Sequence, residues 1–479
     1  MVQPQICATV AGRSATAIRS ARESAEADAD LVELRLDTMD RPDPAAALAD
    51  RRRPAIVTCR PVREGGFFSG SEEERRRILE EASALGAEFV DVEWDAGFDA
   101  LVRARKGRGV VMSKHDFTGM PSAIADLLAE MRKSGAEIVK LAVTTSTLSD
   151  LLPLLDAGSS SDVVLIGMGP AGLSSRILAA RFRSRWTYAG DAIAPGQITI
   201  ARLLHEFRFR RIRGDAAVYG VVGRPVTHSL SAAMHNAGFE ALNVNAVYVP
   251  LEAADVSDFR RFANAVELRG ASVTIPFKID VMPVLDEVSP LATAVGAVNT
   301  IVVDHGRWIG TNTDVDGFME PVRRRTNVKG VRATVLGAGG AARAAGYALQ
   351  REGAQVSIAA RRAEAAAAVA ESIGARVDRW PPEEGSWDLL VNATPIGSRA
   401  VPGSPLPGVA GRGLVYDLIY EPDPTELMRT AARAGCRVIG GLEMLVAQAE
   451  RQFELWTGRR PPNGLFADAA AEAIRKRAS

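Results

Sequence analysis

Eight short apolar runs recur over residues 5–192, and they constrain the fold of this part of the chain more than any other feature. The runs cover residues 6–10, 31–36, 55–59, 89–93, 110–113, 138–143, 163–167 and 186–189. Amphipathic stretches with a helical pattern, such as residues 72–85 and 122–133, lie between several of them. Strands that alternate with helical crossovers form parallel sheets, and eight such units predict a (β/α)8 barrel. The active site of such a barrel lies at the C-terminal ends of its strands.

Charged side chains interrupt or follow five of these runs. They are Glu33, Arg35, Asp37, Arg60, Glu93, Lys114, His115, Asp116 and Lys140. A charge inside an apolar strand costs several kcal/mol unless it is paired or functional. One such residue can be a core ion pair, but the same pattern on five strands indicates one polar cavity.

A lysine and a histidine on neighbouring strands point to imine chemistry. Lys140 lies within the apolar segment 137–143, where desolvation lowers the pKa of a lysine and frees its amine to attack a ketone. The resulting imine withdraws electrons and makes a neighbouring C–H acidic, so a base is needed beside it. His115 follows the preceding run, and a histidine has a suitable pKa to take this proton and return it to a leaving hydroxyl.

Three arginines indicate that the substrate of this cavity is an anion. Arg35 and Arg60 close strand runs, and Arg176 follows the glycine-containing loop 169–175. Arginine binds carboxylates through two parallel hydrogen bonds. Each arginine taken alone would more often be a surface charge.

Several motifs of this region together resemble type I 3-dehydroquinate dehydratase. They are ELRLD at 33–37, TCR at 58–60, EGG at 64–66, SKHDF at 113–117, VKLAV at 139–143, SSRI at 174–177 and APGQ at 194–197, and the resemblance covers residues 1 to about 205. It implies that Lys140 forms the Schiff base, that His115 moves the C2 proton and protonates the departing hydroxyl, and that Glu64 orients His115. It also implies substrate contacts from Glu33, Arg35, Arg60, Arg176 and Gln197. Where many members carry a serine four residues before the glutamine, this chain has Ile193.

A second α/β unit is expected after a short polar bridge at residues 208–217, whose basic run reads as a solvated helix end. Strand-like runs at 217–222, 246–249, 271–275 and 300–303 belong to one βα region, and the run at 333–336 opens another. We therefore expect a barrel domain at residues 1–210, a substrate-binding domain at 217–315 completed by C-terminal helices at 442–479, and a Rossmann-type domain at 316–441.

A strand, a glycine-rich turn and a helix follow one another over residues 331–350. The turn, GAGGAA at 337–342, allows backbone amides to approach a pyrophosphate at a helix N-terminus. The motif is weak alone, but here a strand precedes it and a helix follows it. The next strand, 355–359, is followed by Arg361 and Arg362 and no acidic residue, which favours the 2′-phosphate of NADP. The alternative for the two arginines is a solvated helix start.

Lys278 and Asp314 follow separate strand-like runs, so they can form a pair that moves a proton to or from an alcohol during hydride transfer. Ser229 and Ser231 offer hydroxyls near a helix start, which suits a carboxylate, although a simple helix cap is the alternative.

The motifs of the second half resemble shikimate dehydrogenase from Val218 to about residue 475. They are HSLS at 228–231, SVTIPFK at 272–278, GAVNT at 296–300, NTD at 312–314, GAGGAA at 337–342, NATPIG at 392–397, DLIYEPDPT at 417–425 and GGLEMLVAQ at 440–448. The resemblance implies that Lys278 and Asp314 form the catalytic pair. It implies shikimate contacts from Ser229, Ser231, Thr274, Asn299, Asp314, Tyr420 and Gln448. It implies NADP contacts from Gly337, Ala338, Gly339, Gly340, Ala341, Arg361, Arg362 and Gly441. The chain departs from the pattern at Ala360, where relatives often carry Asn.

The amino-acid composition limits the kinds of ligand and partner that the protein is expected to bind. Lys and Arg together number 58, as do Asp and Glu, and this balance argues against nucleic acid as a partner. Cys7, Cys59 and Cys436 share no metal-ligand spacing, and the five histidines form no zinc-like pair, so no metal is expected. The sequence has no apolar stretch of about 18 residues and begins without a secretory pattern, so we expect no membrane span and a cytoplasmic location.

The two resemblances together imply a fused shikimate-pathway enzyme, acting in chorismate and aromatic amino acid biosynthesis. It would dehydrate 3-dehydroquinate to 3-dehydroshikimate and reduce that product to shikimate with NADPH. One alternative is a catabolic form that acts on quinate with NAD. A Schiff-base aldolase is a second, disfavoured by SKHDF and SSRI. The third is a non-catalytic sensor, whose signature would be loss of Lys140, His115, Lys278 or Asp314, and all four are present.

Overall fold

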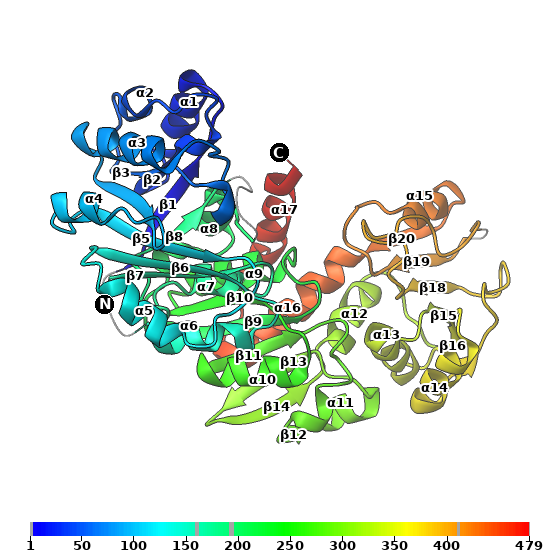
Figure 1. Ribbon diagram of the computed structural model, residues 1–479. Coiled ribbons are helices and arrows are strands. Elements are labelled where there is room, and N and C mark those ends of the chain that lie inside the picture. The colour runs from blue at the N-terminus through cyan, green and yellow to red at the C-terminus, as the bar shows by residue number, and fades with distance from the viewer. Residues whose placement is uncertain (1–2, 159–161, 191–195, 410–411, 479) are drawn as a thin grey trace. The chain divides into compact units, whose positions relative to one another are not determined.

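The computed structural model describes residues 3–158, 162–190, 196–409 and 412–478 (Figure 1). The chain divides into two compact units. The first comprises Met1–Val218, Val226–His228 and Asn245–Glu267, and the second comprises Tyr219–Pro225, Ser229–Val244 and Leu268–Ser479. No helix of the described ranges is both long enough and apolar enough to cross a membrane.

The first unit contains a sheet of eight strands in the order β7-β6-β5-β4-β3-β2-β1-β8, which confirms the predicted barrel. The strands are β1 (Gln5–Val10), β2 (Leu31–Arg35), β3 (Ala55–Thr58), β4 (Phe89–Glu93), β5 (Val110–Asp116), β6 (Ile138–Thr144), β7 (Val163–Met168) and β8 (Trp186–Ala189). Their neighbours pair in parallel. The ring closes where Arg185 N donates to Val163 O at 2.8 Å, beside a parallel bridge between Val163 and Ser184.

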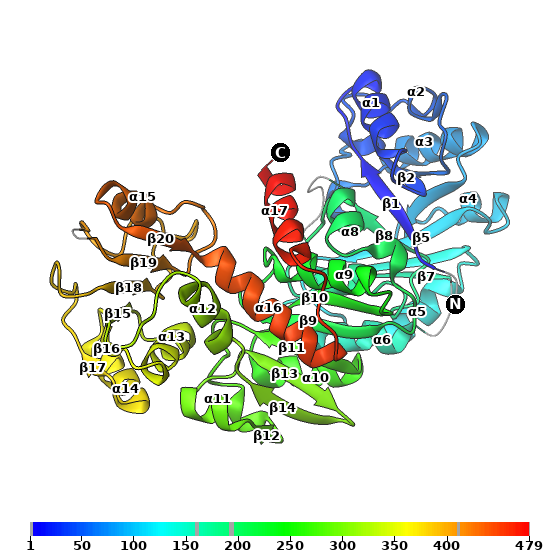
Figure 2. The ribbon, with the colours of Figure 1, turned by 180° about the vertical axis from the view of Figure 1, so that it is seen from behind.

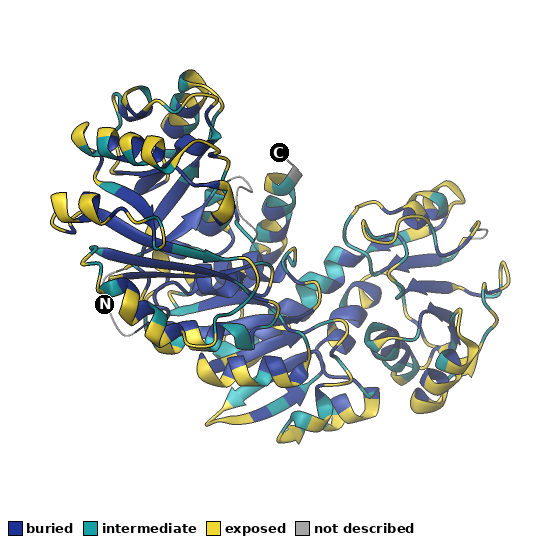
Figure 3. Ribbon diagram, viewed as in Figure 1, coloured by how far each residue is buried: buried dark blue, intermediate teal, exposed yellow. Residues whose placement is uncertain are grey.

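Helices connect the strands of the barrel and expose their polar sides (Figure 3). They are α1 (Ala15–Ala25), α2 (Pro44–Leu48), α3 (Glu72–Ala84), α4 (Asp99–Ala104), α5 (Ile124–Arg132), α6 (Leu152–Ala157), α7 (Leu173–Ile177) and α8 (Ile200–His205), with 3-10 turns η1 (Leu36–Thr38), η2 (Val62–Glu64), η3 (Ser149–Leu151) and η4 (Phe209–Arg211). Side chains cap several helix starts. Ser14 Oγ accepts from Ala17 N before α1, and Ser71 Oγ accepts from Glu74 N before α3.

The interior of the barrel has an apolar layer below a charged one. The apolar layer comprises Cys7, Leu31, Ile56, Val111, Ile138, Ala142, Val164, Ile166, Met168, Trp186 and Tyr188. Side chains on one face of a strand recur every second residue, so Glu33 follows Leu31 and Lys140 follows Ile138 on the inward face. Both charged side chains are buried. The strand alternation therefore places the charges at the C-terminal end of the barrel, where active sites of this fold lie.

A second sheet has six strands in the order β10-β9-β11-β13-β14-β12. They are β9 (Ala217–Gly223), β10 (Ala246–Glu252), β11 (Leu268–Val273), β12 (Glu287–Val288), β13 (Thr300–Asp304) and β14 (Arg307–Thr311), with α9 (Ser231–Ala241), α10 (Val256–Ala265), η5 (Met282–Val284) and α11 (Pro290–Val295). The sequence predicted a strand at 271–275, but β11 ends at Val273. Phe277 N donates to Thr274 O at 2.9 Å in a turn around Pro276, which has no N–H to donate to a ladder.

The third sheet lies in the second unit and is parallel throughout, in the order β17-β16-β15-β18-β19-β20. Counted along the chain, this is the 3-2-1-4-5-6 order of dinucleotide-binding folds, so the predicted Rossmann fold is confirmed. Its strands are β15 (Arg332–Leu336), β16 (Gln355–Ala359), β17 (Arg376–Val377), β18 (Leu389–Asn392), β19 (Leu414–Asp417) and β20 (Arg437–Gly440).

The helices of this part are α12 (Asp314–Arg323), α13 (Gly340–Arg351), α14 (Ala363–Ile373), α15 (Glu426–Arg433), α16 (Gly441–Thr457) and α17 (Leu465–Ala478). Helix α16 leaves the parallel sheet after β20 and extends to β11 and β13 of the second sheet (Figure 2). It packs closely on α12, because a Cβ at Gly317 would lie 2.6 Å from Gln448 Cβ.

Candidate active sites

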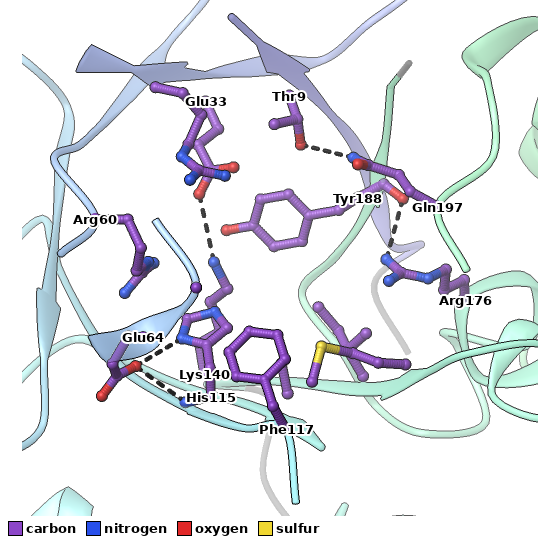
Figure 4. Close-up of a pocket in the computed structure, with 15 residues that line it drawn as sticks. Thr9, Glu33, Arg60, Glu64, His115, Phe117, Lys140, Arg176, Tyr188 and Gln197 are labelled. Atoms are coloured by element: carbon purple, nitrogen blue, oxygen red, sulfur yellow. Dashed lines mark hydrogen bonds and ion pairs between the residues drawn. The ribbon is translucent and has the colours of Figure 1, made fainter. Parts of the chain in front are cut away.

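A cavity of about 90 Å³ opens among the charged residues of the barrel (Figure 4). Since a water molecule needs roughly 10–15 Å³ of such space, the cavity can hold several waters or a small organic acid. It is lined by Thr9, Glu33, Arg35, Arg60, Glu64, Gly65, His115, Phe117, Lys140, Ala142, Ile166, Met168, Arg176, Tyr188 and Gln197. All eight barrel residues predicted to act in catalysis or substrate binding therefore line this one cavity: Glu33, Arg35, Arg60, Glu64, His115, Lys140, Arg176 and Gln197.

Lys140 lies at the centre of this cavity, but its surroundings are less apolar than the strand sequence suggests. Its Nζ lies 3.3 Å from Glu33 Oε1 and 3.2 Å from Asp91 Oδ2. The ring of Tyr188 covers Nζ at 4.3 Å from the ring centroid. The amine is therefore held in one position by two carboxylates and an aromatic face.

Arg35 and Arg60 each pair with buried carboxylates. Arg35 donates to both oxygens of Asp37, at 2.9 and 2.7 Å. Arg60 contacts Asp91 Oδ1 at 2.9 Å and Glu93 Oε1 at 2.8 Å. Burial disfavours the charged form of Arg60, but these carboxylates outweigh it and raise the pKa of Arg60.

Arg176 differs electrostatically from Arg60. Burial lowers the pKa of the Arg176 guanidinium to about 10. Its Nη1 donates to the main-chain oxygen of Tyr188 at 3.5 Å, and its side chain is directed toward the cavity (Figure 4). A ligand carboxylate placed beside it would offset the cost of burying this cation.

His115 and Glu64 form a buried pair at the other side of the cavity. Glu64 Oε2 lies 2.9 Å from His115 Nδ1 and accepts from His115 N at 3.1 Å. Burial, together with Arg60 and Lys140, lowers the pKa of His115 well below its usual value. Burial also raises the pKa of Glu64 to about 7. A neutral His115 whose Nδ1–H donates to ionised Glu64 leaves Nε2 as a proton acceptor.

The remaining barrel predictions concern the loop after β8. Gln197 Nε2 donates to Thr9 Oγ1 at 2.8 Å at the rim of the cavity. Ile193 lies outside the described residues, so its consequence stays a prediction.

In the second unit, Lys278 and Asp314 form the predicted pair. Lys278 Nζ lies 2.5 Å from Asp314 Oδ2, and both side chains are largely buried. Asn299 Nδ2 donates to the other oxygen, Asp314 Oδ1, at 2.7 Å and lies 3.4 Å from Gln448 Oε1. Four of the predicted residues thus share one hydrogen-bonded cluster.

The glycine-rich turn lies against this cluster. A Cβ at Gly340, the first residue of α13, would lie 2.9 Å from Lys278 Cδ, so a larger residue there would displace the Lys278 side chain. Gly337 has a φ of 114°, which favours glycine, and a Cβ at Gly339 would meet nothing within 4 Å. Ala338 and Ala341 belong to the same turn and the first turn of α13. The backbone around Gly339 is therefore open at a helix N-terminus, and this arrangement fits a dinucleotide pyrophosphate.

The other predicted residues of the second unit lie at element ends. Ser231 N, at the start of α9, donates to Ser229 Oγ at 3.2 Å, and Arg477 donates to Ser229 O at 3.3 Å. Thr274 follows β11, and burial raises the pKa of Tyr420 after β19. Gly441 opens α16 so tightly that a Cβ there would lie 2.3 Å from Leu418 O. Arg361 and Arg362 follow β16 and are exposed.

Three regions of the chain match models of known protein families. Residues 6–213 match the model of type I 3-dehydroquinase, residues 221–301 that of the shikimate dehydrogenase substrate binding domain, and residues 441–475 that of the shikimate 5'-dehydrogenase C-terminal domain. The chain is 35% identical over 483 residues to a bifunctional 3-dehydroquinate dehydratase/shikimate dehydrogenase, chloroplastic, of Arabidopsis thaliana, covering 92% of this chain and 80% of that one. This chain belongs to the same bifunctional family.

Relatives of the second unit alone agree with this assignment to the bifunctional family. The NADP(+) shikimate dehydrogenase of Carboxydothermus hydrogenoformans is 40% identical, covering 53% of this chain and 95% of its own. A shikimate dehydrogenase solved in complex with NADP+ superposes with a TM-score of 0.51 at 34% identity, covering 55% of this chain and 97% of its own. The Thermus thermophilus shikimate 5-dehydrogenase, solved with shikimate, gives a TM-score of 0.50 at 37% identity, covering 54% and 99%. Within the described ranges of this family member, no group of three or more His, Cys, Asp or Glu side chains is placed to hold a metal.

Four side chains of the barrel site were not predicted from the sequence: Asp91, Tyr188, Thr9 and Phe117. The signal for Asp91 was present, because it stands two residues before Glu93 in FVDVE and both must face one side of a strand. Phe117 stacks on His115 with ring centroids 6.4 Å apart, and it follows SKHD directly. In the second unit, Thr300, Thr313 and Gln452 were missed, and Gln452 carried no sequence signal beyond its place in a helix.

Proposed function

We propose that this chain dehydrates 3-dehydroquinate to 3-dehydroshikimate in the barrel and reduces that ketone to shikimate with NADPH in the second unit. The observation that carries the proposal is that each unit joins a lysine to its acid–base partner: Lys140 with His115 in one cavity, and Lys278 with Asp314 at 2.5 Å. The Arabidopsis relative carries both activities in its name. We assign the first activity to residues 1–210, and the second to residues 217–315 and 442–479 with a cofactor domain at 316–441.

In the proposed dehydration, the Lys140 amine attacks the ketone carbon and expels water to form an imine. His115 Nε2 then removes a proton from the neighbouring carbon, and the electron pair moves into the imine to give an enamine. The enamine expels the substrate hydroxyl, which leaves as water with the proton held by His115. Hydrolysis of the remaining imine releases the conjugated ketone and restores Lys140.

The charged residues around Lys140 suit the binding of a hydroxylated carboxylic acid. We assign the substrate carboxylate to Arg176, because burial disfavours its charge and an anion would offset that cost. Glu33, Arg35, Arg60 and Gln197 would hold hydroxyl groups at the rim. Glu64 would keep His115 in the tautomer whose Nε2 accepts protons, since it contacts Nδ1 at 2.9 Å.

In the proposed reduction, bound NADPH supplies the hydride. The Lys278 ammonium donates a proton to the carbonyl oxygen as it becomes a hydroxyl, and the Asp314 carboxylate keeps Lys278 in place. Asn299, Thr274, Ser229, Ser231, Tyr420 and Gln448 would hold the substrate's carboxylate and hydroxyls.

The glycine turn and two arginines support NADP(H) as the cofactor. The backbone of Gly337, Ala338, Gly339, Gly340 and Ala341, with Gly441, would hold the dinucleotide, and the open space at Gly339 leaves room for its pyrophosphate. Arg361 and Arg362 would pair with the 2′-phosphate, because both are exposed where β16 ends and no acidic side chain follows Ala359 directly. Ala360 provides no side-chain hydrogen bond there, so the preference for NADP over NAD would depend on the two arginines.

We place the enzyme in a reducing compartment such as the cytoplasm, since its three cysteines are buried and form no disulfide.

Borohydride trapping tests the imine step. Incubation with 3-dehydroquinate and borohydride should add the substrate skeleton to the peptide that contains Lys140, as measured by mass spectrometry. Lys140→Met should lose the adduct, whereas Lys114→Met, a control on the adjacent strand, should keep it. Absence of the adduct in the wild type, or its persistence in Lys140→Met, would refute the proposed nucleophile.

A further inference from the structure

We propose that Gln452, a buried side chain of α16 outside the family motifs, is a positioning residue for the reduction, acting on Asp314 through Thr300 and Asn299. The inference rests on the proposed reductase function. Gln452 is fully buried and lies four residues, about one helical turn, beyond Gln448 on the same face of α16.

An unbroken line of hydrogen bonds joins Gln452 to the catalytic pair. Gln452 Nε2 donates to Thr300 Oγ1 at 3.0 Å, and Thr300 Oγ1 donates to Asn299 Oδ1 at 2.8 Å. Asn299 Nδ2 then donates to Asp314 Oδ1 at 2.7 Å, and Lys278 Nζ donates to Asp314 Oδ2 at 2.5 Å. Every donor in the line points toward Asp314, so the carboxylate accepts at both oxygens.

Main-chain groups fix the direction of the line at two places. Gln452 Nε2 also lies 3.1 Å from the Asn299 main-chain oxygen, which can only accept, so the amide nitrogen must face it. Thr313 N, which can only donate, lies 2.7 Å from Asn299 Oδ1, so the amide oxygen must face it. Asn299 therefore presents its nitrogen to Asp314.

The contacts of the Gln452 amide oxygen support the same orientation of this side chain. Ser272 Oγ donates to Gln452 Oε1 at 2.7 Å. His235, which also hydrogen bonds to Gln452, is buried, and burial lowers its pKa to about 3, so it is neutral and brings no competing charge. Gln452 thus holds Asn299 through two contacts. Its Nε2 donates directly to the Asn299 main-chain oxygen, and it reaches the Asn299 side chain through the Thr300 hydroxyl.

The chemical consequence concerns the geometry of proton transfer. Thr300 Oγ1 and Thr313 N donate to Asn299 Oδ1, and Thr313 Oγ1 also lies 3.2 Å from it; these donors polarise the amide and strengthen the bond from Nδ2 to Asp314. Without Gln452, the Thr300 hydroxyl can rotate toward Thr313 Oγ1, which lies 3.1 Å away, and Asn299 loses one of those donors. Asp314 would then hold Lys278 less rigidly at the point where a proton is transferred.

Gln452→Met removes both donations with little change in volume. We expect kcat for reduction of 3-dehydroshikimate to fall about tenfold, the loss of roughly one hydrogen bond at the transition state. The KM for NADPH and the dehydratase activity of the same chain should stay within about twofold of wild type. Gln350→Met is the matched control, since Gln350 on α13 donates to Gly374 O away from Asp314.

A second pair of variants separates positioning from packing. Thr300→Val should lower kcat like Gln452→Met, and Thr300→Ser, which keeps the hydroxyl, should restore it. In the double variant Gln452→Met/Thr300→Val the two losses should not multiply, because both break the same line. If Gln452→Met does not fold, the comparison of Thr300→Val with Thr300→Ser still tests the line of hydrogen bonds to Asp314.

The outcomes that overturn the inference are distinct. Wild-type kcat in Gln452→Met, multiplied losses in the double variant, or equal loss in Thr300→Ser and Thr300→Val would each reject the positioning role while leaving the reductase function intact. Absence of reduction by the wild type would reject the proposed function, and the inference with it.

Discussion

The pair of Glu64 and His115 predicts how dehydration depends on pH. The structure raises the pKa of Glu64 to about 7 and lowers that of His115, in both cases chiefly through burial. Above pH 7, ionised Glu64 accepts from His115 Nδ1–H and leaves Nε2 as a base. Below pH 7, protonated Glu64 donates to Nδ1 instead, so that Nε2 carries the proton and cannot accept another. The rate of dehydration at saturating substrate should therefore rise with pH through about 7.

Glu64→Gln tests this reasoning and carries a calculable magnitude. A hydrogen bond to an ionised carboxylate contributes about 1.5–3 kcal/mol and one to a neutral amide about 0.5–1.5 kcal/mol, so kcat should fall roughly 5- to 10-fold and lose its rise near pH 7. Although the Glu64→Gln variant should lose activity, its folded state should be more stable than that of the wild type at high pH. A carboxyl whose pKa is raised on folding costs stability as pH rises from its unfolded value toward its folded one. The rise from 4.5 to about 7 corresponds to at most about 3 kcal/mol.

The assay follows the ultraviolet absorbance of the conjugated product from pH 5.5 to 9, together with thermal unfolding at pH 5 and pH 8. The variant should unfold at a higher temperature than wild type at pH 8, with a smaller difference at pH 5. A wild-type rate independent of pH across this range, or a Glu64→Gln variant that keeps the wild-type profile, would refute the assigned tautomer. Reduction of 3-dehydroshikimate on the same chain serves as the control and should be unaffected.

Three further predictions concern other parts of the two sites. Asp91→Asn removes the carboxylate that Lys140, Arg60 and Ser113 share, so urea unfolding at pH 7 should show a loss of about 3–5 kcal/mol, and equal stability of variant and wild type would contradict this. Replacing Arg361 and Arg362 by Ala should raise the KM for NADPH at least about tenfold and leave that for NADH unchanged, as measured by initial rates; equal changes for both cofactors would exclude a 2′-phosphate contact. Gly340→Ala places a methyl 2.9 Å from Lys278 Cδ, so reduction should slow while dehydration continues, and unimpaired reduction would show that this approach is not required.

The strands and helices of the barrel could be predicted because the hydrophobic pattern that marks each of them lies within a short stretch of sequence. Its eight strands begin and end within three residues of the predicted runs, and Lys140 and His115 stand out as charges in apolar sequence. The charged residues were predictable as a set, but their pairing was not. Arg60 pairs with Asp91 and Glu93 only because β3 and β4 lie side by side in the closed ring.

Most of the side-chain contacts that could not be predicted join residues that are far apart in the sequence. Gln452 and Thr300 are 152 residues apart, and only the packing of α16 on the second sheet brings them together. Lys140 is buried as expected, but its contacts with Glu33 and Asp91 on other strands were not predicted. The early end of β11 has a local cause, since Pro276 was visible in the sequence.

One measurement tests the central claim of two independent sites on one chain. Purified protein is given 3-dehydroquinate and NADPH, and NADPH oxidation is followed for wild type, Lys140→Met, Lys278→Met and an equimolar mixture of the two variants. We predict oxidation by the wild type, none by either variant alone, and recovery in the mixture, because one variant releases 3-dehydroshikimate that the other reduces. No oxidation by the wild type, or no recovery in a mixture of two folded variants, would contradict the account.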